Sequence, residues 1–194
     1  FDACRVLEGH DDTVRSVIEL RNGKLASGSR DSTIRIWDLD KSEGDEGYCR
    51  VLEGHTNGVS SVIELSNGKL ATGSQDNTIR IWDLDKQEGE DGYCRVLEGD
   101  TNWVRAVIEL RNGKLATGSG DNTIRIWDLE KSVGEDGYCR VLEGHTNWVN
   151  SAIELRNGKL ATGSEDSTIR IWDLEKQAEE YGYCRVLRLS LIHI

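Results

Sequence analysis

The chain has 194 residues and a formal net charge of −11, from 35 Asp and Glu against 24 Lys and Arg. This acidity argues against nucleic acid and against an anionic membrane as the main partner, because both are bound through Lys and Arg. No apolar run approaches the roughly 20 residues of a membrane-spanning helix, so we expect a soluble chain whose partners are proteins or peptides.

One stretch of sequence occurs four times at constant spacing. Residues 69–83 are KLATGSQDNTIRIWD, and near-identical copies end in Trp-Asp at intervals of 45 residues. A fixed period of this size is typical of propellers and solenoids. The sequence therefore predicts repeats at about residues 4–48, 49–93, 94–138 and 139–183, with a further outer strand at 184–187.

Each repeat contains four short segments with the composition of β-strands. In the second repeat they are residues 48–53, 59–65, 70–74 and 78–82, rich in Val, Ile, Thr and aromatic side chains and bounded by Gly, Asn and Asp. No stripe of helical period competes with them, so the predicted fold class is all-β. Asn67-Gly68 predicts a two-residue hairpin turn with positive φ at both residues.

A single four-stranded sheet cannot bury both of its faces. Val59, Val62, Ile63 and Leu65 nevertheless put apolar side chains on both faces of one strand. A strand covered by sheets on either side has this pattern. We therefore expect neighbouring repeats to stack against one another.

The most regular sequence motifs of these repeats also occur in a known family. Gly54-His55, Asp76 and Trp82-Asp83 resemble the Gly-His and Trp-Asp marks of the WD-repeat β-propellers, and the resemblance covers nearly the whole chain. It implies a β-propeller of four-stranded antiparallel blades, with four blades present. In that family a buried tetrad of Trp, Ser or Thr, His and Asp stabilises each blade. By motif position the tetrads are His10, Ser27, Asp31 and Trp37; His55, Thr72, Asp76 and Trp82; Thr117, Asp121 and Trp127 in the third repeat; and His145, Thr162, Asp166 and Trp172.

The tetrad has a physical reason that is independent of the family. A buried indole N–H needs an acceptor, a hydroxyl can accept that bond and donate onward, and an imidazole can bridge the hydroxyl to a carboxylate. The third repeat has Asp100 in place of the His. Since two carboxylates cannot act as an imidazole bridge, we predict that the third blade is the weakest and that Asp100→His raises the thermal midpoint.

Two site chemistries are disfavoured by repetition. A hydroxyl, a His and an Asp within reach of one another are also the parts of a nucleophilic site, but an active site is normally built once, so we expect no enzyme. The cysteines recur once per repeat without close pairs, which predicts reduced, apolar core thiols in a cytoplasmic, intracellular protein, and neither a metal nor a cofactor. They are Cys4, Cys49, Cys94, Cys139 and Cys184.

Comparison of the four repeats with one another shows where the chemistry differs. Three positions vary strongly, two beside the start of the inner strand and one just before the turn Asp, and we expect all of them on one rim. In WD-repeat propellers this resembles the top surface, where peptides and protein partners commonly dock. We call these positions the variable rim. It consists of Thr13, Gly58, Trp103 and Trp148; Arg15, Ser60, Arg105 and Asn150; and Arg30, Gln75, Gly120 and Glu165.

Trp103 and Trp148 are the strongest anchor candidates on the variable rim, because they are additional to the motif tryptophans and aromatic anchors often dominate binding. Arg105 could stack on an aromatic ring or pair with an acidic group, and Glu165 would select a basic group. The alternative is that both indoles only fill space against neighbouring loops. The acidic loops, such as residues 83–92, are expected to be solvated on the opposite rim.

The outer strand occurs five times and the inner three strands only four times, which leaves residues 3–7 without a sheet. We therefore expect an incomplete, open propeller. A four-bladed ring, an open arc and a homodimer that closes an eight-bladed ring remain alternatives, with the arc favoured for an isolated chain and dimers at higher concentration.

The two ends of the sequence predict a fragment of a longer repeat array. The chain begins at Phe1 and contains no Met. After the repeat is lost at Arg188, residues 189–194 resemble the translated end of a transposase sequencing adaptor, so residues 188–194 are interpreted as a non-repeat tail and a sequencing artefact. Deliberate design or truncation is the rival explanation, because consensus design also produces nearly identical repeats.

These observations favour a non-enzymatic scaffold or recognition module that binds protein or peptide through the variable rim. The alternative is a purely architectural repeat segment of a larger multidomain protein, for example a sensor or a ubiquitin-ligase-type adaptor. An enzyme fragment has no unrepeated, converging polar set to support it.

Overall fold

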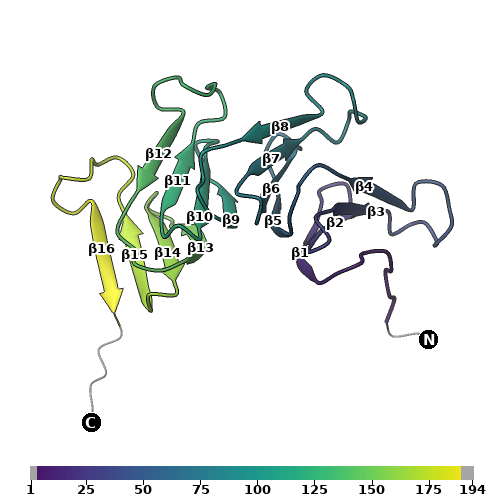
Figure 1. Cartoon of the computed structure of the whole chain (residues 1–194), viewed down its shortest axis with the longest axis horizontal. Coiled ribbons are helices and arrows are strands. Elements are labelled where there is room, and N and C mark those ends of the chain that lie inside the picture. The colour runs from purple at the N-terminus through teal and green to yellow at the C-terminus, as the bar shows by residue number, and fades with distance from the viewer. Residues whose placement is uncertain (1–3, 189–194) are drawn as a thin grey trace, which may run out of the picture.

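The computed structural model describes residues 4–188, and in these residues the chain forms four antiparallel four-stranded sheets and no helix. Each sheet takes its four strands in chain order, and the sheets follow one another along an arc (Figure 1). The all-β, propeller-like architecture predicted from the sequence is confirmed. We call the sheets blades 1 to 4.

Every blade contains an inner strand of six residues, two central strands and an outer strand. Blade 1 consists of β1 (Val14–Glu19), β2 (Leu25–Ser29), β3 (Ile34–Trp37) and β4 (Cys49–Leu52), and blade 2 of β5 (Val59–Glu64), β6 (Leu70–Ser74), β7 (Ile79–Trp82) and β8 (Cys94–Leu97). Blade 3 consists of β9 (Val104–Glu109), β10 (Leu115–Ser119), β11 (Ile124–Trp127) and β12 (Cys139–Leu142), and blade 4 of β13 (Val149–Glu154), β14 (Leu160–Ser164), β15 (Thr168–Trp172) and β16 (Cys184–Arg188).

The turns between strands differ from the predicted type. At Asn67-Gly68 only the glycine has positive φ, and Leu65 N–H donates to Lys69 O across the turn. This is a three-residue loop with a left-handed Gly at its end, so the two-residue turn predicted from Asn-Gly is wrong. A second tight turn, at Asp76-Asn77, places Asn77 at a φ of 70°.

Neighbouring blades pack face to face, as the apolar pattern predicted. Ile34 and Leu52 of blade 1 belong to one buried cluster with Val59, Val62 and Trp82 of blade 2. Equivalent clusters join blade 2 to blade 3 and blade 3 to blade 4. Most of the core therefore lies between blades, so that each blade depends on its neighbours for burial.

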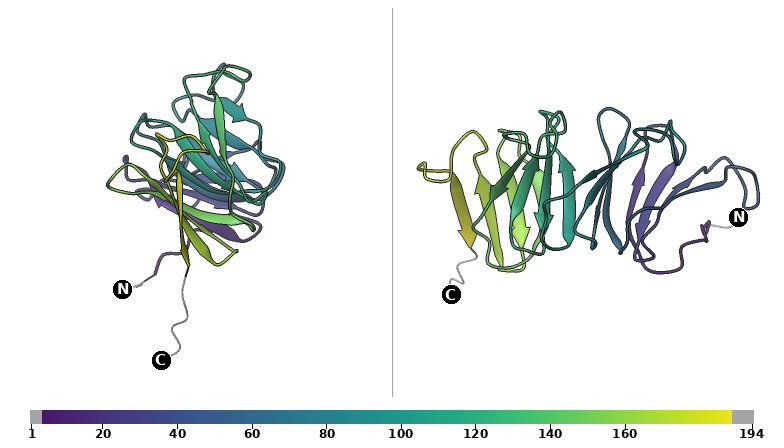
Figure 2. Two further views of the ribbon diagram at one scale, coloured as in Figure 1. Left: turned by 90° about the vertical axis from the view of Figure 1, so that its left-hand side faces the viewer. Right: turned by 45° about the horizontal axis from the view of Figure 1, so that its top comes forward.

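The arc is open in the described residues: blades 1 and 4 lie at its two ends (Figures 1 and 2). Residues 4–7 form no strand, and the described residues contain four outer strands, one in each blade. Arg5 Nη1 nevertheless donates to Leu39 O at 2.6 Å, as Arg50 Nη1 of β4 does to Leu84 O of the next blade.

The end of the last outer strand lies one residue beyond the predicted position. Arg188 pairs with Thr168 and completes β16. Residues 1–3 and 189–194, which include most of the predicted tail, lie outside the described residues.

The repeated cysteines are free thiols, but they are not fully buried. Cys49, Cys94, Cys139 and Cys184 are half-buried at the margin of the core, and Cys4 is exposed. The prediction of core thiols is therefore wrong for Cys4 and too strong for the others, because the outer strand of each blade faces solvent on one side. Burial raises the pKa of the Cys139 thiol to about 11.

Candidate functional site

A hydrogen-bonded tetrad lies inside three of the four blades. In blade 2, Trp82 Nε1 donates to Thr72 Oγ1 at 2.9 Å, and Thr72 Oγ1 lies 2.8 Å from His55 Nε2. His55 Nδ1 is 2.7 Å from Asp76 Oδ2. Because the hydroxyl accepts from the indole, its own proton can go to Nε2, so that Nδ1–H donates to the carboxylate. The same chain of contacts joins Trp37, Ser27, His10 and Asp31, and Trp172, Thr162, His145 and Asp166.

The tetrad carboxylates are held in the ionised form. Burial acts to raise the pKa of Asp76, but hydrogen bonds from His55 and Thr78 outweigh it and keep the pKa well below its ordinary value. Burial lowers the pKa of His145. A neutral imidazole between a hydroxyl and a carboxylate is the arrangement expected of a structural bridge, and each tetrad hydroxyl lies inside a strand.

In blade 3 another side chain takes the place of the missing histidine, which the sequence did not reveal. Arg125 Nη1 donates to Asp100 Oδ1, to Asp121 Oδ2 at 2.8 Å and to Thr123 Oγ1 at 2.6 Å. A guanidinium thus stands between the two carboxylates in place of the imidazole. The equivalent Arg80 instead lies over the ring of Trp82, with Nη1 3.7 Å from Cys94 Sγ.

The replacement leaves part of the polar network unsatisfied. Trp127 Nε1 still donates to Thr117 Oγ1 at 2.9 Å. Asp100 Oδ2, however, is buried and has no hydrogen-bond partner among residues 4–188. Burial raises the pKa of Asp100 to about 6, against the opposing effect of the Arg125 charge. A buried carboxylate with one free oxygen costs stability.

The variable rim forms because of a bulge in each inner strand. In blade 2 the pairing passes from Val59↔Ser74 directly to Ser61↔Gly73, so Ser60 has no partner in the register. A bulge re-aims the side chain of the extra residue. The same shift occurs at the other three residues of this set, which are Arg15, Arg105 and Asn150.

Backbone hydrogen bonds bring the other two sets of the variable rim together. Gly120 N–H donates to Trp103 O at 2.8 Å, and Glu165 N–H donates to Trp148 O at 3.0 Å. The same bond joins Arg30 to Thr13 and Gln75 to Gly58. Residues that are about 17 positions apart in the sequence are therefore neighbours on one rim, as predicted.

Six of the twelve residues of the variable rim surround one hollow of about 250 Å³. We call it the rim hollow. It is lined by Arg15, Ser60, Gln75, Trp103, Arg105 and Asn150. Of the other predicted contact residues, Trp148 and Glu165 touch Arg105, whereas Arg30 lies outside the hollow with Nε 3.9 Å from Asp12 Oδ2.

The two additional tryptophans lie next to each other. The ring centroids of Trp103 and Trp148 are 6.0 Å apart, and each residue is 38% exposed. The Arg105 guanidinium lies 4.5 Å from the Trp148 ring centroid, and its Nε donates to Asn150 Oδ1. Asn150 Nδ2 donates to Glu165 Oε1 at 3.1 Å. Five predicted rim residues thus form one connected cluster.

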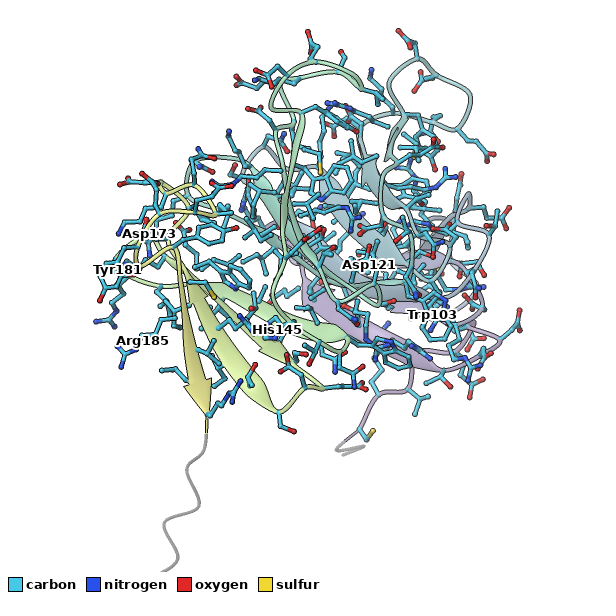
Figure 3. The ribbon with its side chains drawn as sticks, turned by 60° about the vertical axis from the view of Figure 1, so that its left-hand side comes forward. Trp103, Asp121, His145, Asp173, Tyr181 and Arg185 are labelled. Atoms are coloured by element: carbon cyan, nitrogen blue, oxygen red, sulfur yellow. The ribbon has the colours of Figure 1, made fainter. Side chains whose placement is uncertain are left out.

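The acidic loops lie on the opposite rim. Lys69 Nζ beside the Asn-Gly turn is 3.2 Å from Asp83 Oδ2 at the start of the acidic loop, so both belong to one end of the blade. In Figure 3 the corresponding loop of blade 4, with Asp173 and Tyr181, lies at the left of the view and Trp103 lies at the right. Tyr181 is 99% exposed.

The sequence matches a known family. A family model described as "WD domain, G-beta repeat" matches residues 1–38, 47–83, 92–128 and 136–173, which together are more than half of the chain. The chain belongs to the WD40 repeat family. WD40 repeats are generally protein-interaction scaffolds. A search of curated proteins found no match.

The described blades lack two other kinds of feature. Within residues 4–188 no group of three or more His, Cys, Asp or Glu side chains could hold a metal ion. In the same residues no helix is long and apolar enough to cross a membrane.

Proposed function

We propose that this WD40 chain is a non-enzymatic scaffold that binds a protein or peptide through the variable rim. The observation that carries the proposal is that the residues that differ between near-identical repeats gather around the rim hollow. The tetrads use a buried hydroxyl and imidazole for structure, which leaves no repeated polar set free for catalysis. Nucleic acid and membrane surfaces are not the proposed partners, because the net charge is −11.

The exposure of the indoles distinguishes this proposal from a purely architectural role. Trp103 and Trp148 keep 38% of their surface in solvent although a buried position would stabilise the chain more. The two rings also pack against each other, and the Arg105 guanidinium lies over the Trp148 ring. Exposed, pre-positioned aromatic side chains are typical of binding anchors.

A peptide-array pull-down with the full chain tests the proposal. We expect Trp103→Ala and Trp148→Ala to lose the peptides that the parent chain captures, while the thermal midpoint changes little. Tyr181→Ala is the matched control, because it removes an exposed aromatic from the opposite rim. Equal capture by all four proteins, or loss of folding in the Trp variants without a peptide-specific effect, contradicts the proposal.

A second candidate, self-association, is favoured by the two end blades. Val14 of blade 1 is 45% exposed, whereas its equivalents Val59, Val104 and Val149 are fully buried. Ile169 of blade 4 is 49% exposed, whereas the equivalent Ile residues of blades 1 to 3 are fully buried. A hollow of about 620 Å³ lies against the face of blade 1 and one of about 470 Å³ against the face of blade 4.

The inner interfaces show what fits these faces. Ile34 and Leu52 pack against the blade that follows them, and blade 4 exposes their equivalents, Ile169 and Leu187. Blade 1 exposes Val14 and Val17, which correspond to the residues that receive this contact in blade 2. We propose that the end faces of two copies bind each other and close an eight-bladed ring.

Light scattering over a range of concentrations tests self-association. The expected mass rises from one chain to two as concentration increases, and Val17→Asp and Ile169→Asp each keep the chain monomeric because they place a charge in the new interface. A single-chain mass at every concentration contradicts the proposal, as does a dimer that survives both substitutions.

A further inference from the structure

The charge of the rim hollow is opposite to that of the whole molecule. Its lining contains two guanidinium groups, from Arg15 and Arg105, and no carboxylate, although the chain carries a net charge of −11. Low-dielectric walls focus the field of such charges into a concave site. The hollow is therefore a local positive region on an acidic protein.

Arg15 is a cation without a partner in the described residues. It makes no hydrogen bond and no ion pair there, and its side chain is directed to the rim by the bulge in β1. By contrast, Arg21 on the opposite rim has its guanidinium 2.9 Å from Ser66 O. An unpaired guanidinium in a hollow offers a fork of donors that matches carboxylate or phosphate oxygens.

Arg105 is held in place by neighbours that leave one end of its guanidinium open. Nε donates to Asn150 Oδ1, Nη2 lies 3.7 Å from Glu165 Oε1, and the group stacks on Trp148. Nη1 has no partner among the described residues. Glu165, which the sequence suggested as a selector of basic groups, is thus already engaged by Arg105 and Asn150, so the structure argues against that role.

The neutral part of the lining supplies further donors and an apolar edge. The Ser60 hydroxyl and the Gln75 amide lie between the two arginines in the lining, and neither side chain has a hydrogen-bond partner in the described residues. Trp103 closes one side with an exposed indole. The arrangement fits an anionic side chain in the hollow and an apolar side chain against the indole.

We infer that the rim hollow binds an anionic side chain, a carboxylate or a phosphate, on a partner segment that also carries an apolar residue for Trp103. This inference rests on the proposed function of the variable rim. Arg15 supplies the free charge, and Arg105, fixed by Asn150, Glu165 and Trp148, supplies a pre-oriented second donor. Hydrogen bonds to charged groups are among the stronger polar contacts in a binding site.

A positional peptide library with the full chain tests the inference. One position carries Asp or Glu, phosphoserine, a neutral residue or Lys in separate arms, beside a fixed apolar residue. Enrichment of the Asp and Glu arm assigns a carboxylate, and enrichment of the phosphoserine arm alone assigns a phosphate. Enrichment of the neutral or Lys arm overturns the inference.

Substitutions of Arg15, with one of Arg21 as the control, test the role of Arg15 in binding. Arg15→Gln is expected to weaken the selected peptide about 10- to 100-fold, with a smaller salt dependence of binding. Arg21→Gln changes the net charge equally on the opposite rim and is expected to leave the affinity within about twofold. Arg15→Glu is expected to shift enrichment toward the Lys arm. Equal affinity of Arg15→Gln and Arg21→Gln overturns the role of Arg15.

The proposed function and this inference fail in different ways. Peptides that depend on Trp103 but show no preference for an anionic residue leave the rim as a binding surface and refute the anionic site. Anion-selective capture that does not change in Trp103→Ala and Trp148→Ala refutes the proposed anchors instead. Capture that no rim substitution alters refutes both.

Discussion

The tetrads and the variable rim differ in how far their side chains are buried and paired by hydrogen bonds. In blade 2 every group of the tetrad has a partner, from Trp82 through Thr72 and His55 to Asp76. On the rim, Arg15 has no partner in the described residues, and two indoles remain 38% exposed. The side chains that recur in each blade stabilise it, whereas some that differ between blades stay exposed or unpaired in the described residues.

Blade 3 is an exception, because there one of the tetrad residues itself differs. Asp100 takes the position of the histidine, and Arg125 leaves the tryptophan face to reach it. The same arginine occurs in all four repeats, as Arg35, Arg80, Arg125 and Arg170. A residue with a minor role in three blades is thus essential to charge balance in the fourth.

The largest expected effect is on Arg125. Arg125→Gln leaves Asp100 and Asp121 buried beside each other without a cation, which is expected to cost about 3–5 kcal/mol of unfolding free energy. Arg80→Gln is the matched control in blade 2 and is expected to cost about 1 kcal/mol, because Arg80 lies on the face of Trp82 beside Cys94 and, among the described residues, pairs with no carboxylate. Urea denaturation near neutral pH measures both, and equal costs contradict the bridging role of Arg125.

The next effect concerns the tetrad hydroxyl. Thr72→Val keeps the shape but leaves the Trp82 indole N–H and one His55 nitrogen without partners, which is expected to cost about 2–4 kcal/mol. Thr117→Val in blade 3 removes only the acceptor for Trp127 and is expected to cost less. A larger cost for Thr117→Val than for Thr72→Val contradicts the tetrad as the stronger network.

A smaller effect, of opposite sign, is expected for Asp100→His. The imidazole restores the bridge between Thr117 and Asp121 and releases Arg125, which is expected to raise the thermal midpoint by about 2–4 °C near neutral pH. Differential scanning calorimetry measures the shift. An unchanged or lower midpoint contradicts the prediction that the third blade is the weakest.

The gain from Asp100→His should depend on pH. The folded pKa of Asp100 is about 6, above its ordinary 3.8, so the stability contributed by this group is full below about pH 4 and is lost as pH rises through about 6. The new histidine resembles His145, whose pKa is lowered by burial, so its contribution is lost as pH falls. The advantage of the variant should therefore be largest near pH 8 and smallest near pH 5.

The blades and their tetrads could be predicted from the sequence, because the motifs that mark them are short and occur several times. The tetrad positions recur at fixed offsets: Thr72 and Trp82 lie in the paired strands β6 and β7, and His55 and Asp76 lie in the loop and turn beside them. The variable rim could be predicted as well, since residues that differ between the four repeats mark positions that the blade fold does not require. The placement of Trp103 beside Trp148 confirms the common rim, while its role in binding stays a prediction.

What the sequence did not reveal depends on contacts between segments. Arg125 has the same sequence context as Arg80. Its hydrogen-bond partner differs only because Asp100, distant in the sequence, replaces the imidazole that lies near Arg80 in blade 2. The engagement of Glu165 by Asn150 and Arg105 likewise joins two blades. The Asn67-Gly68 turn was predicted wrongly because the same dipeptide also fits a three-residue loop that ends in a left-handed glycine.

The central claim is that the variable rim serves binding and the tetrads serve stability. Its most direct test measures peptide affinity and unfolding free energy together for Trp103→Ala, with Tyr181→Ala as the control. We predict at least a 10-fold loss of affinity with about 1 kcal/mol or less of destabilisation for Trp103→Ala, and neither change for Tyr181→Ala. A destabilisation of about 3 kcal/mol with unchanged affinity would show that the indole is part of the frame and would contradict the account.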